Sequence, residues 1–318
     1  MQNNASVKSA PPVTYEKQPL SVAEQIEKLK RRGLIIQDYS FAQKTLSNIS
    51  YYRLRAYTYP FQDNANPDHP FTQSISLEDI ISLLTFDSKL RTLVFSAIEK
   101  IEIALRAQLV YHFSLRYGSH WHVNRSLFNE EVDKNGYSKF DNLMENLTHE
   151  VNRGHEDFIA HYKRKYAAPA EPPSWMGLET VTFGTLSKFL SNLNGCNEKY
   201  EVVRYFGLNN ADLFENWIYG INTIRNVCAH HGRLWNRGRL AKIKYPTNPI
   251  NPFIQQRWGR EYSMLYGYLC AIPYLLHSMS ATDYGFKESL KTLLSAHPIV
   301  DEAKMGFPDG WRADPFWV

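Results

Sequence analysis

The longest periodic segment, residues 76–118, most constrains what this chain can fold into. Ser76 is placed to cap a helix, and apolar residues then recur at the spacing of one helix face. They are Ile81, Leu84, Leu90, Leu93, Val94, Ile98, Ile101 and Leu105. The segment is longer than an ordinary globular helix, so we expect two helices with a joint near Thr85–Asp87 and an end at Gly118.

Helical patterns occupy most of the remaining chain. Ser21 and Glu24 have the spacing of a capping box, and Gly33 marks the end of that helix. Further helices are expected at residues 40–60, 177–193, 200–208, 210–231, 256–279 and 284–295. We find no strand alternation, internal repeat or glycine-rich phosphate loop. The pattern predicts an all-α fold.

The predicted organisation is one compact region, residues 15–318, after a disordered segment at residues 1–14. Within it, residues 119–174 form a polar insertion that ends in a linker rich in proline and alanine. No apolar run approaches the roughly 20 residues of a membrane span, and the first residues lack the apolar core of a signal peptide. We therefore expect a protein without a membrane anchor.

The three cysteines, Cys196, Cys228 and Cys270, are scattered and odd in number. They predict a reducing, cytoplasmic location and argue against a disulfide framework or a structural zinc module. A zinc site built from Cys228, His230 and His231 is disfavoured because three ligands so close on one helix cannot surround an ion. No metal and no cofactor are expected.

Positive charge is concentrated between Glu215 and Glu261, where there is no acidic residue and there are eight Lys or Arg residues. The net charge is +4, so the rest of the chain carries −4. Such a block is typical of a polyanion-binding surface. The alternative is a solvated loop whose charges share a sign.

The block begins with "RNVCAHHGRLWNRGR", residues 225–239. If Gly232 ends the preceding helix, His230 lies in its last turn, where the helix dipole favours a protonated imidazole. Asn226 and His230 share a face, so the amide can orient the ring. Arg225 and His230 are five positions apart, about 140° around an ideal helix. They converge on one ligand only if the helix end is distorted or a second copy of the motif faces the first.

An arginine binds phosphate, and a histidine transfers protons near neutral pH. Together they suit metal-free RNA cleavage, in which the ribose 2′-hydroxyl attacks the adjacent phosphate. The motif alone is also compatible with an ordinary helix cap.

Six blocks in order show a wider resemblance: "PLSVAEQIEKLKRRGLII", "LSNISYYRLRAYTYPF", "FDSKLRTLVFSAIEKIEIALRAQLVYHFS", "PSWMGLETVTFGTLSKF", "IRNVCAHHGRLWNR" and "MGFPDGWRADPFW". From about Pro19 onward the chain resembles the Abi-like abortive-infection family, the AbiD/AbiF group, whose members have a HEPN-type RNase fold. The resemblance implies a HEPN-like helical bundle with additional helices. It also implies that Arg225, Asn226 and His230 are catalytic and that a homodimer pairs two motifs into one site.

Other residues are candidates for support or RNA binding: Glu102, Arg106, His231, Arg233, Arg237 and Arg239. Glu99, Glu102 and Arg106 lie on one helix face, and Glu102 can pair with Arg225 or with Arg106. An ordinary intrahelical ion pair is the alternative. Arg106 and His112 also fit a loose second motif, although no polar residue follows that arginine.

The leading hypothesis is a metal-independent endoribonuclease toxin of an abortive-infection or toxin–antitoxin antiphage system. Its partners would be substrate RNA and either a small structured RNA or a protein antitoxin, as the resemblance implies. The alternative is a non-catalytic HEPN protein that binds a structured small RNA or a nucleotide without cleaving it.

Overall fold

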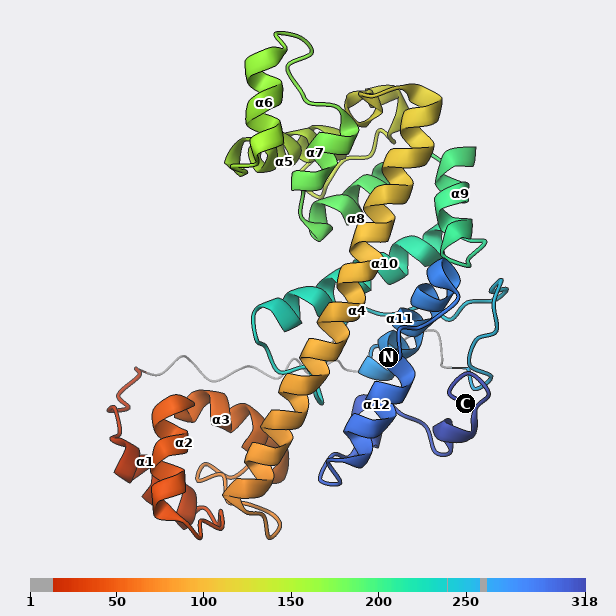
Figure 1. The fold of residues 1–318 in the computed structure, drawn as a ribbon. Coiled ribbons are helices and arrows are strands. Elements are labelled where there is room, and N and C mark those ends of the chain that lie inside the picture. Colours follow the sequence, from red (N-terminus) through yellow and green to blue (C-terminus); the bar gives the residue numbers. More distant parts are fainter. Residues whose placement is uncertain (1–13, 239, 258–261) are drawn as a thin grey trace, which may run out of the picture. The chain divides into compact units, whose positions relative to one another are not determined.

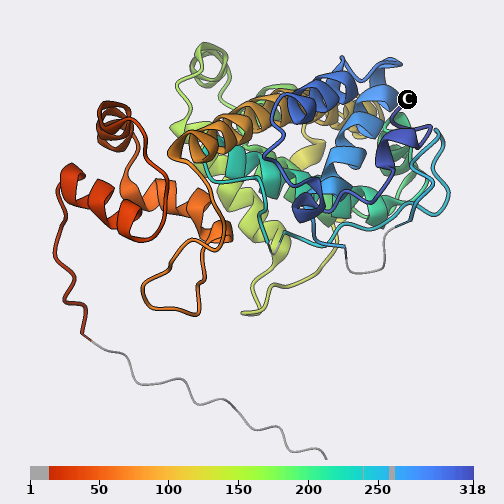
Figure 2. The same ribbon diagram turned by 90° about the horizontal axis from the view of Figure 1, so that it is seen from below.

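The computed structural model describes residues 14–238, 240–257 and 262–318. Regular secondary structure in this part of the chain consists of helices, accompanied only by isolated β-bridges (Figures 1 and 2). The all-α class is therefore confirmed. Two predictions fall partly on residues outside the described part, the disordered segment 1–14 and the RNA-binding role of Arg239.

The described backbone divides into two compact units, one that ends at Ser82 and one that begins at Leu83. The described part of the first unit contains α1 (Val22–Arg31), α2 (Tyr39–Asn48), α3 (Tyr51–Thr58) and the short 3₁₀ turn η1 (Tyr59–Phe61). Ser21 and Glu24 form the predicted capping box. Gly33 follows α1 with a φ of +99°, a left-handed conformation that glycine adopts without a steric cost.

The helix predicted at residues 40–60 is interrupted. Ile49 is extended, and the Ser50 hydroxyl accepts a hydrogen bond of 3.2 Å from the backbone N–H of Arg53, which starts α3. A serine cap within an otherwise helical pattern is therefore the local cause of the break.

The segment predicted as two helices is one helix, α4 (Leu77–Tyr117), of 41 residues. Ser76 caps it as predicted, with its hydroxyl accepting from the backbone N–H of Asp79 at 3.1 Å. The joint near Thr85–Asp87, predicted from the length of the segment, is wrong, because the helix continues through Asp87. This residue is fully buried and paired with Arg91 one turn later.

The predicted insertion, residues 119–174, contains two 3₁₀ turns, η2 (Trp121–Val123) and η3 (Arg125–Leu127), and two α-helices, α5 (Lys139–Arg153) and α6 (Asp157–Lys165). Although the segment is polar overall, α5 has a buried stripe of Phe140, Leu143, Leu147 and Val151. This stripe packs α5 against α7 (Ser174–Thr180) and α8 (Phe183–Asn192). The insertion is thus attached to the second unit through its own apolar face.

The centre of the second unit is α10 (Ala211–Ala229), which packs against α8, α9 (Asn197–Tyr205) and α11 (Leu265–Ser280). The helix predicted at residues 256–279 begins later than expected, at Leu265, and α12 (Phe286–Ser295) agrees with prediction. Trp311 and Trp317 near the C-terminus are buried with ring centroids 4.9 Å apart. The Trp317 indole donates to the Tyr266 hydroxyl at 3.1 Å, which fastens the chain end to α11.

Candidate functional site

Helix α10 presents the arginine–histidine motif. Its N-terminus is capped by Asn210, whose side chain accepts from the backbone N–H of Leu213 at 2.8 Å. Its apolar stripe is buried: Leu213, Trp217, Ile221, Ile224 and Cys228. Burial of this stripe fixes the rotation of α10, so Asn226 lies on the exposed side and Arg225 lies at the boundary.

The end of α10 is a Schellman turn. The backbone N–H of His231 donates to Cys228 O at 3.1 Å, and that of Gly232 donates to Val227 O at 2.8 Å. Helix α10 ends at Ala229, and the left-handed residue is His231, with a φ of +54°. The prediction that Gly232 ends the helix is therefore corrected. A histidine occupies the position at which glycine is usual, and a Cβ there is strained.

His230 caps α10, and its side chain is exposed, as are those of Asn226 and His231. The backbone N–H of His230 donates to Asn226 O at 3.0 Å. The described residues show no side-chain hydrogen bond between Asn226 and His230, and no direct contact between Arg225 and His230. The amide contact suggested by the spacing is not formed here.

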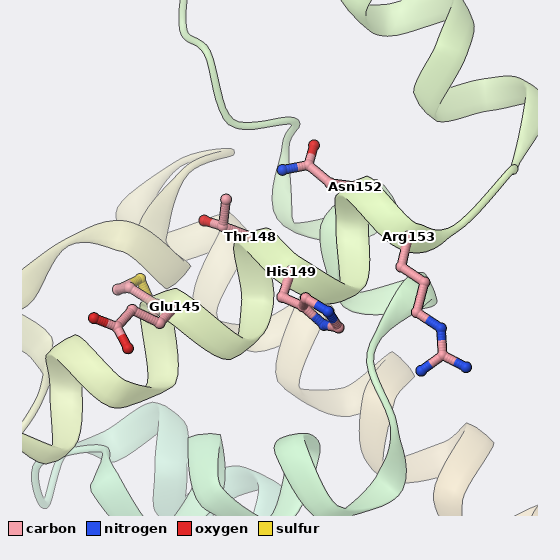
Figure 3. Close-up of a pocket in the computed structure, with 6 residues that line it drawn as sticks. Glu145, Thr148, His149, Asn152 and Arg153 are labelled. Carbon is pink, nitrogen blue, oxygen red and sulfur yellow. The ribbon is translucent and has the colours of Figure 1, made fainter.

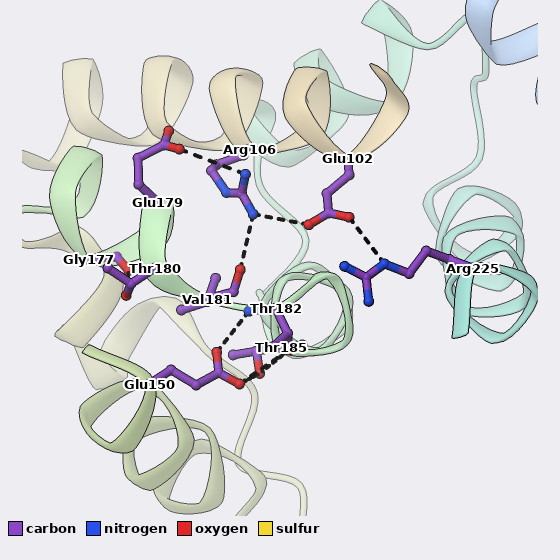
Figure 4. A network of polar contacts seen from close by, with 10 residues as sticks. All are labelled: Glu102, Arg106, Glu150, Gly177, Glu179, Thr180, Val181, Thr182, Thr185 and Arg225. Atoms are coloured by element: carbon purple, nitrogen blue, oxygen red, sulfur yellow. Dashed lines mark hydrogen bonds and ion pairs between the residues drawn. The ribbon is translucent and has the colours of Figure 1, made fainter. Parts of the chain in front are cut away.

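Arg225 points toward α4, where it meets a carboxylate (Figure 4). It also lies over an aromatic ring of α4. Its Nε lies 3.8 Å from Glu102 Oε2, and its guanidinium carbon lies 5.7 Å from the centroid of the Phe95 ring. The Arg225 side chain remains 31% exposed, so solvent or a ligand can still reach it.

Glu102 joins two arginines. Its Oε1 lies 3.2 Å from Nη2 of Arg106, while its Oε2 faces Arg225 (Figure 4). Arg106 also donates to the backbone oxygen of Val181 at 3.0 Å and lies 3.8 Å from Glu179. Both pairings considered for Glu102 are thus present, and Arg225 is linked through α4 to the segment between α7 and α8.

Arg106 itself is buried, and its guanidinium is occupied by these internal contacts. His112, the other residue of the possible second motif, packs edge-on against Tyr111 with ring centroids 5.1 Å apart. Glu99, expected beside Glu102 on the supporting face, is exposed and makes no ion pair with any described residue. Of the three residues Glu99, Glu102 and Arg106, only the last two connect directly to one another.

A buried carboxylate, that of Asp87, anchors the basic loop that follows the motif. Sequence analysis did not predict this role. Oδ1 of Asp87 accepts from the backbone N–H groups of Leu234 and Trp235, at 3.0 and 2.6 Å. Arg91 pairs with the other carboxylate oxygen and donates to Gly232 O at 3.5 Å. This arrangement ties the residues that follow His231 to α4.

Of the three arginines of this loop predicted to bind RNA, Arg233 and Arg237 lie in the described part of the chain. Arg233 donates to Asn236 O at 3.3 Å and lies over the Trp235 ring, 5.9 Å from its centroid. Arg237 is exposed and donates to Arg233 O at 3.2 Å. The loop therefore has internal order, with the Arg237 side chain at its surface.

A hollow of about 540 Å³ adjoins the motif. One wall is a face of α4 that includes Arg91, Phe95 and Glu99, and the other is the end of α10 with Cys228 and His231. The Cys228 thiol is buried, and burial raises its pKa to about 12, so it is a neutral neighbour of the hollow.

Two other hollows are lined by residues outside the motif. One, of about 870 Å³, lies between α5, α8 and the middle of α10 and includes Asn222 and Lys188. The other, of about 650 Å³, is lined only by α5 residues whose side chains fan out from consecutive turns (Figure 3). Since they do not converge, that surface lacks the geometry of a catalytic site.

Within residues 14–238, 240–257 and 262–318, no three His, Cys, Asp or Glu residues are grouped so that they can hold a metal ion. The same described residues contain no helix with the length and apolarity needed to cross a bilayer.

The geometry defines an all-α protein whose motif, at the end of α10, has a partly buried Arg225 and an exposed Asn226 and His230. A family model described as Abi-like protein matches residues 44–236, more than half of the chain. The protein belongs to the Abi-like family, which links it to abortive-infection defence. The matched segment includes Glu102, Arg225 and His230 and stops before Arg237. No curated protein and no solved structure matches the chain significantly.

Proposed function

We propose that this protein is a metal-independent endoribonuclease toxin of an abortive-infection or toxin–antitoxin system, with a HEPN-type active site. The observation that supports it most is the state of Arg225. Its guanidinium is oriented by Glu102 yet remains accessible, on the helix whose C-cap is the exposed His230. An oriented, accessible arginine and a histidine at the exposed end of the same helix suit phosphoryl-transfer chemistry.

In the proposed reaction the ribose 2′-oxygen attacks the adjacent phosphorus. The bond from phosphorus to the 5′-oxygen breaks, which leaves a 2′,3′-cyclic phosphate and a free 5′-hydroxyl. His230 takes the proton from the 2′-hydroxyl, and the imidazolium that forms delivers a proton to the departing 5′-oxygen. Arg225 stabilises the negative charge that accumulates on the phosphate oxygens. Asn226, exposed one turn before His230, is placed to hold the substrate or the ring when RNA is bound.

We further propose that two copies of the chain form one composite site. Arg225 turns toward α4, whereas His230 is the cap of α10, and the described residues show no contact between them. Pairing two motifs brings the arginine of one copy within reach of the histidine of the other. His231, Arg233 and Arg237 are proposed RNA contacts, because they follow the motif in the segment free of acidic residues. A small structured RNA or a protein antitoxin would cover this surface.

The test is cleavage of RNA by the purified protein in EDTA, with the RNA ends sequenced. We expect cyclic phosphate ends, and a loss of about 100-fold or more for Arg225→Ala and for His230→Ala. Arg164→Ala and His161→Ala are matched controls because both residues are exposed on α6. Equal cleavage by the motif variants and the controls would contradict the proposal.

The absence of a direct Arg225–His230 contact also favours a second candidate, a protein that binds RNA or a nucleotide without cutting it. Its signature is RNA binding that weakens steeply with salt, no cleavage under any condition, and no growth arrest when the protein is expressed in bacteria.

A further inference from the structure

The hollow beside the motif has no part in the proposed phosphate chemistry. Its volume of about 540 Å³ lies within the range of about 300–1,000 Å³ typical of small-molecule sites. It lies between α4 and the end of α10, next to the surface where the proposed reaction takes place. A nucleotide whose phosphate reaches Arg225 therefore has its base close to this hollow.

Phe95 is the aromatic residue of the hollow. Its side chain is 37% exposed, and the guanidinium of Arg225 lies over its ring. Exposed rings of this kind bind unpaired bases by stacking, and an adjacent arginine binds the attached phosphate. Since the guanidinium of Arg225 covers one face of the Phe95 ring, the base stacks on the opposite face while Arg225 binds the phosphate.

Three hydroxyl side chains form a column along the hollow. Ser88, Thr92 and Ser96 are spaced four residues apart on α4, so they share one face, and all three are exposed. The Thr92 hydroxyl donates to the backbone oxygen of Ser88 at 3.2 Å, and it still has lone pairs to accept a hydrogen bond. A column of hydroxyls suits the polar edge of a base.

Glu99 is the carboxylate among the residues that line the hollow, where the basic side chains of Arg91 and His231 also lie. Its carboxylate lines the hollow, is exposed, and has no ion-pair partner among the described residues. A carboxylate repels phosphate and accepts hydrogen bonds without donating any. Guanine offers two adjacent donors on its Watson–Crick edge, N1–H and the N2 amino group, which match two carboxylate oxygens. Adenine and cytosine place a ring acceptor beside their single amino group, and that acceptor would face the carboxylate.

We infer that this hollow is a guanine-binding subsite, in which Phe95 stacks on the base and Glu99 accepts from its Watson–Crick edge. The inference rests on the proposed function, since it places the base next to the phosphate that Arg225 contacts. It makes the protein a base-selective nuclease rather than an indiscriminate one.

The experiment has two independent readouts. The first is cleavage of short single-stranded RNAs that vary at the positions flanking the cut. The second is calorimetric titration of the uncleavable probes guanosine 3′-monophosphate and adenosine 3′-monophosphate. We expect wild-type protein to prefer guanine about tenfold or more in both, and Glu99→Gln and Phe95→Leu to reduce that preference toward unity. Glu145→Gln removes the same charge from an exposed position of α5 and should retain the preference.

The outcomes separate this inference from the proposed function. Cleavage without guanine preference, together with equal binding of the two nucleotides, would overturn the subsite and leave the nuclease intact. Preference for adenine or cytosine would overturn it as well. The protein could also bind the guanosine nucleotide in a manner that depends on Glu99 and yet cut no RNA. That outcome would support the subsite and contradict the nuclease proposal.

Discussion

At the scale of single residues, Glu102 connects the motif to the body of the second unit. It contacts Arg225 at 3.8 Å and Arg106 at 3.2 Å, and its own side chain is only 15% exposed. We expect Glu102→Gln to lower kcat for RNA cleavage about 10- to 100-fold with little change in KM. The amide fills the same space, but it no longer fixes the arginine that stabilises the transition state.

Glu179→Gln is the matched control for Glu102→Gln. Glu179 also lies near Arg106, at 3.8 Å, but it is half exposed and does not contact Arg225. Its replacement should leave kcat within about twofold, since ion pairs of exposed residues contribute little. If both variants lose activity equally, the effect comes from Arg106 and not from the orientation of Arg225.

His231 gives a prediction about stability. Its left-handed backbone, with a φ of +54°, costs a residue with a Cβ about 1 kcal/mol more than it costs glycine. We therefore expect His231→Gly to raise the free energy of unfolding by up to about 1 kcal/mol in urea titrations. Ala229→Gly, within the last turn of α10, should lower it by a similar amount. Destabilisation by His231→Gly would mean that contacts of the imidazole outweigh the strain.

At the scale of elements, α4 depends on a charged pair within its buried face. Asp87 is fully buried, Arg91 is 7% exposed, and the carboxylate also accepts two backbone N–H groups of the loop after α10. Removing one member of a buried pair leaves the other charge uncompensated, at a cost of about 3–5 kcal/mol. We expect Asp87→Asn to destabilise the protein by about that amount, as measured by urea unfolding.

The double variant Asp87→Asn with Arg91→Met tests the cause. It removes both charges and keeps a side-chain oxygen as acceptor, so it should be less destabilised than Asp87→Asn alone. A double variant that is destabilised by the sum of both single changes would show that the two side chains act independently.

The Asp87–Arg91 pair also shows which features of α4 can be predicted from the sequence and which cannot. The apolar period of α4 was visible, and so was the cap at Ser76. The joint near Asp87 follows from the length of the segment alone, and no local signal shows that Asp87 is buried, because the backbone groups that donate to it belong to Leu234 and Trp235, 147 and 148 positions away. A local pattern predicts which face of a helix is buried, but not which distant backbone groups neutralise a charge on that face.

In the candidate site, too, local features could be predicted from the sequence, whereas contacts between distant segments could not. Spacing identified the two possible partners of Glu102. The contact with Arg106 is local, one turn along α4, whereas the contact with Arg225 depends on where α10 lies beside α4. The end of α10 was misplaced because glycine is the usual left-handed residue, whereas here the Schellman turn closes with His231 in that conformation. Phe95 was missed because a half-exposed aromatic residue on a long helix has no distinguishing local signal.

At the scale of the whole molecule, stability should depend on pH through buried histidine. His122 in η2 is fully buried beside His120, with ring centroids 6.2 Å apart. Burial, and to a lesser extent the neighbouring histidine, lowers the pKa of His122 to about 4, against a slight opposing effect of the Pro172 backbone. In the unfolded chain the group titrates near its usual pKa of about 6.5.

The sign of the effect follows from this difference. Above about pH 6.5 the histidine is neutral in both states, and the stability is fully present. As pH falls toward 4, the unfolded chain binds a proton that the folded protein does not, so the free energy of unfolding decreases. The expected loss from His122 between pH 7 and pH 5 is about 2 kcal/mol.

Urea titrations of wild type, His122→Leu and the exposed control His161→Leu at the two pH values measure this loss. The difference between pH 7 and pH 5, rather than the stability itself, is the quantity to compare, because His122→Leu also changes core packing. We expect the difference to shrink by about 2 kcal/mol in His122→Leu and to persist in His161→Leu. Some dependence should remain, since burial also lowers the pKa of His297. An unchanged difference in His122→Leu would mean that the buried ring is already protonated near pH 7 or that another group is responsible.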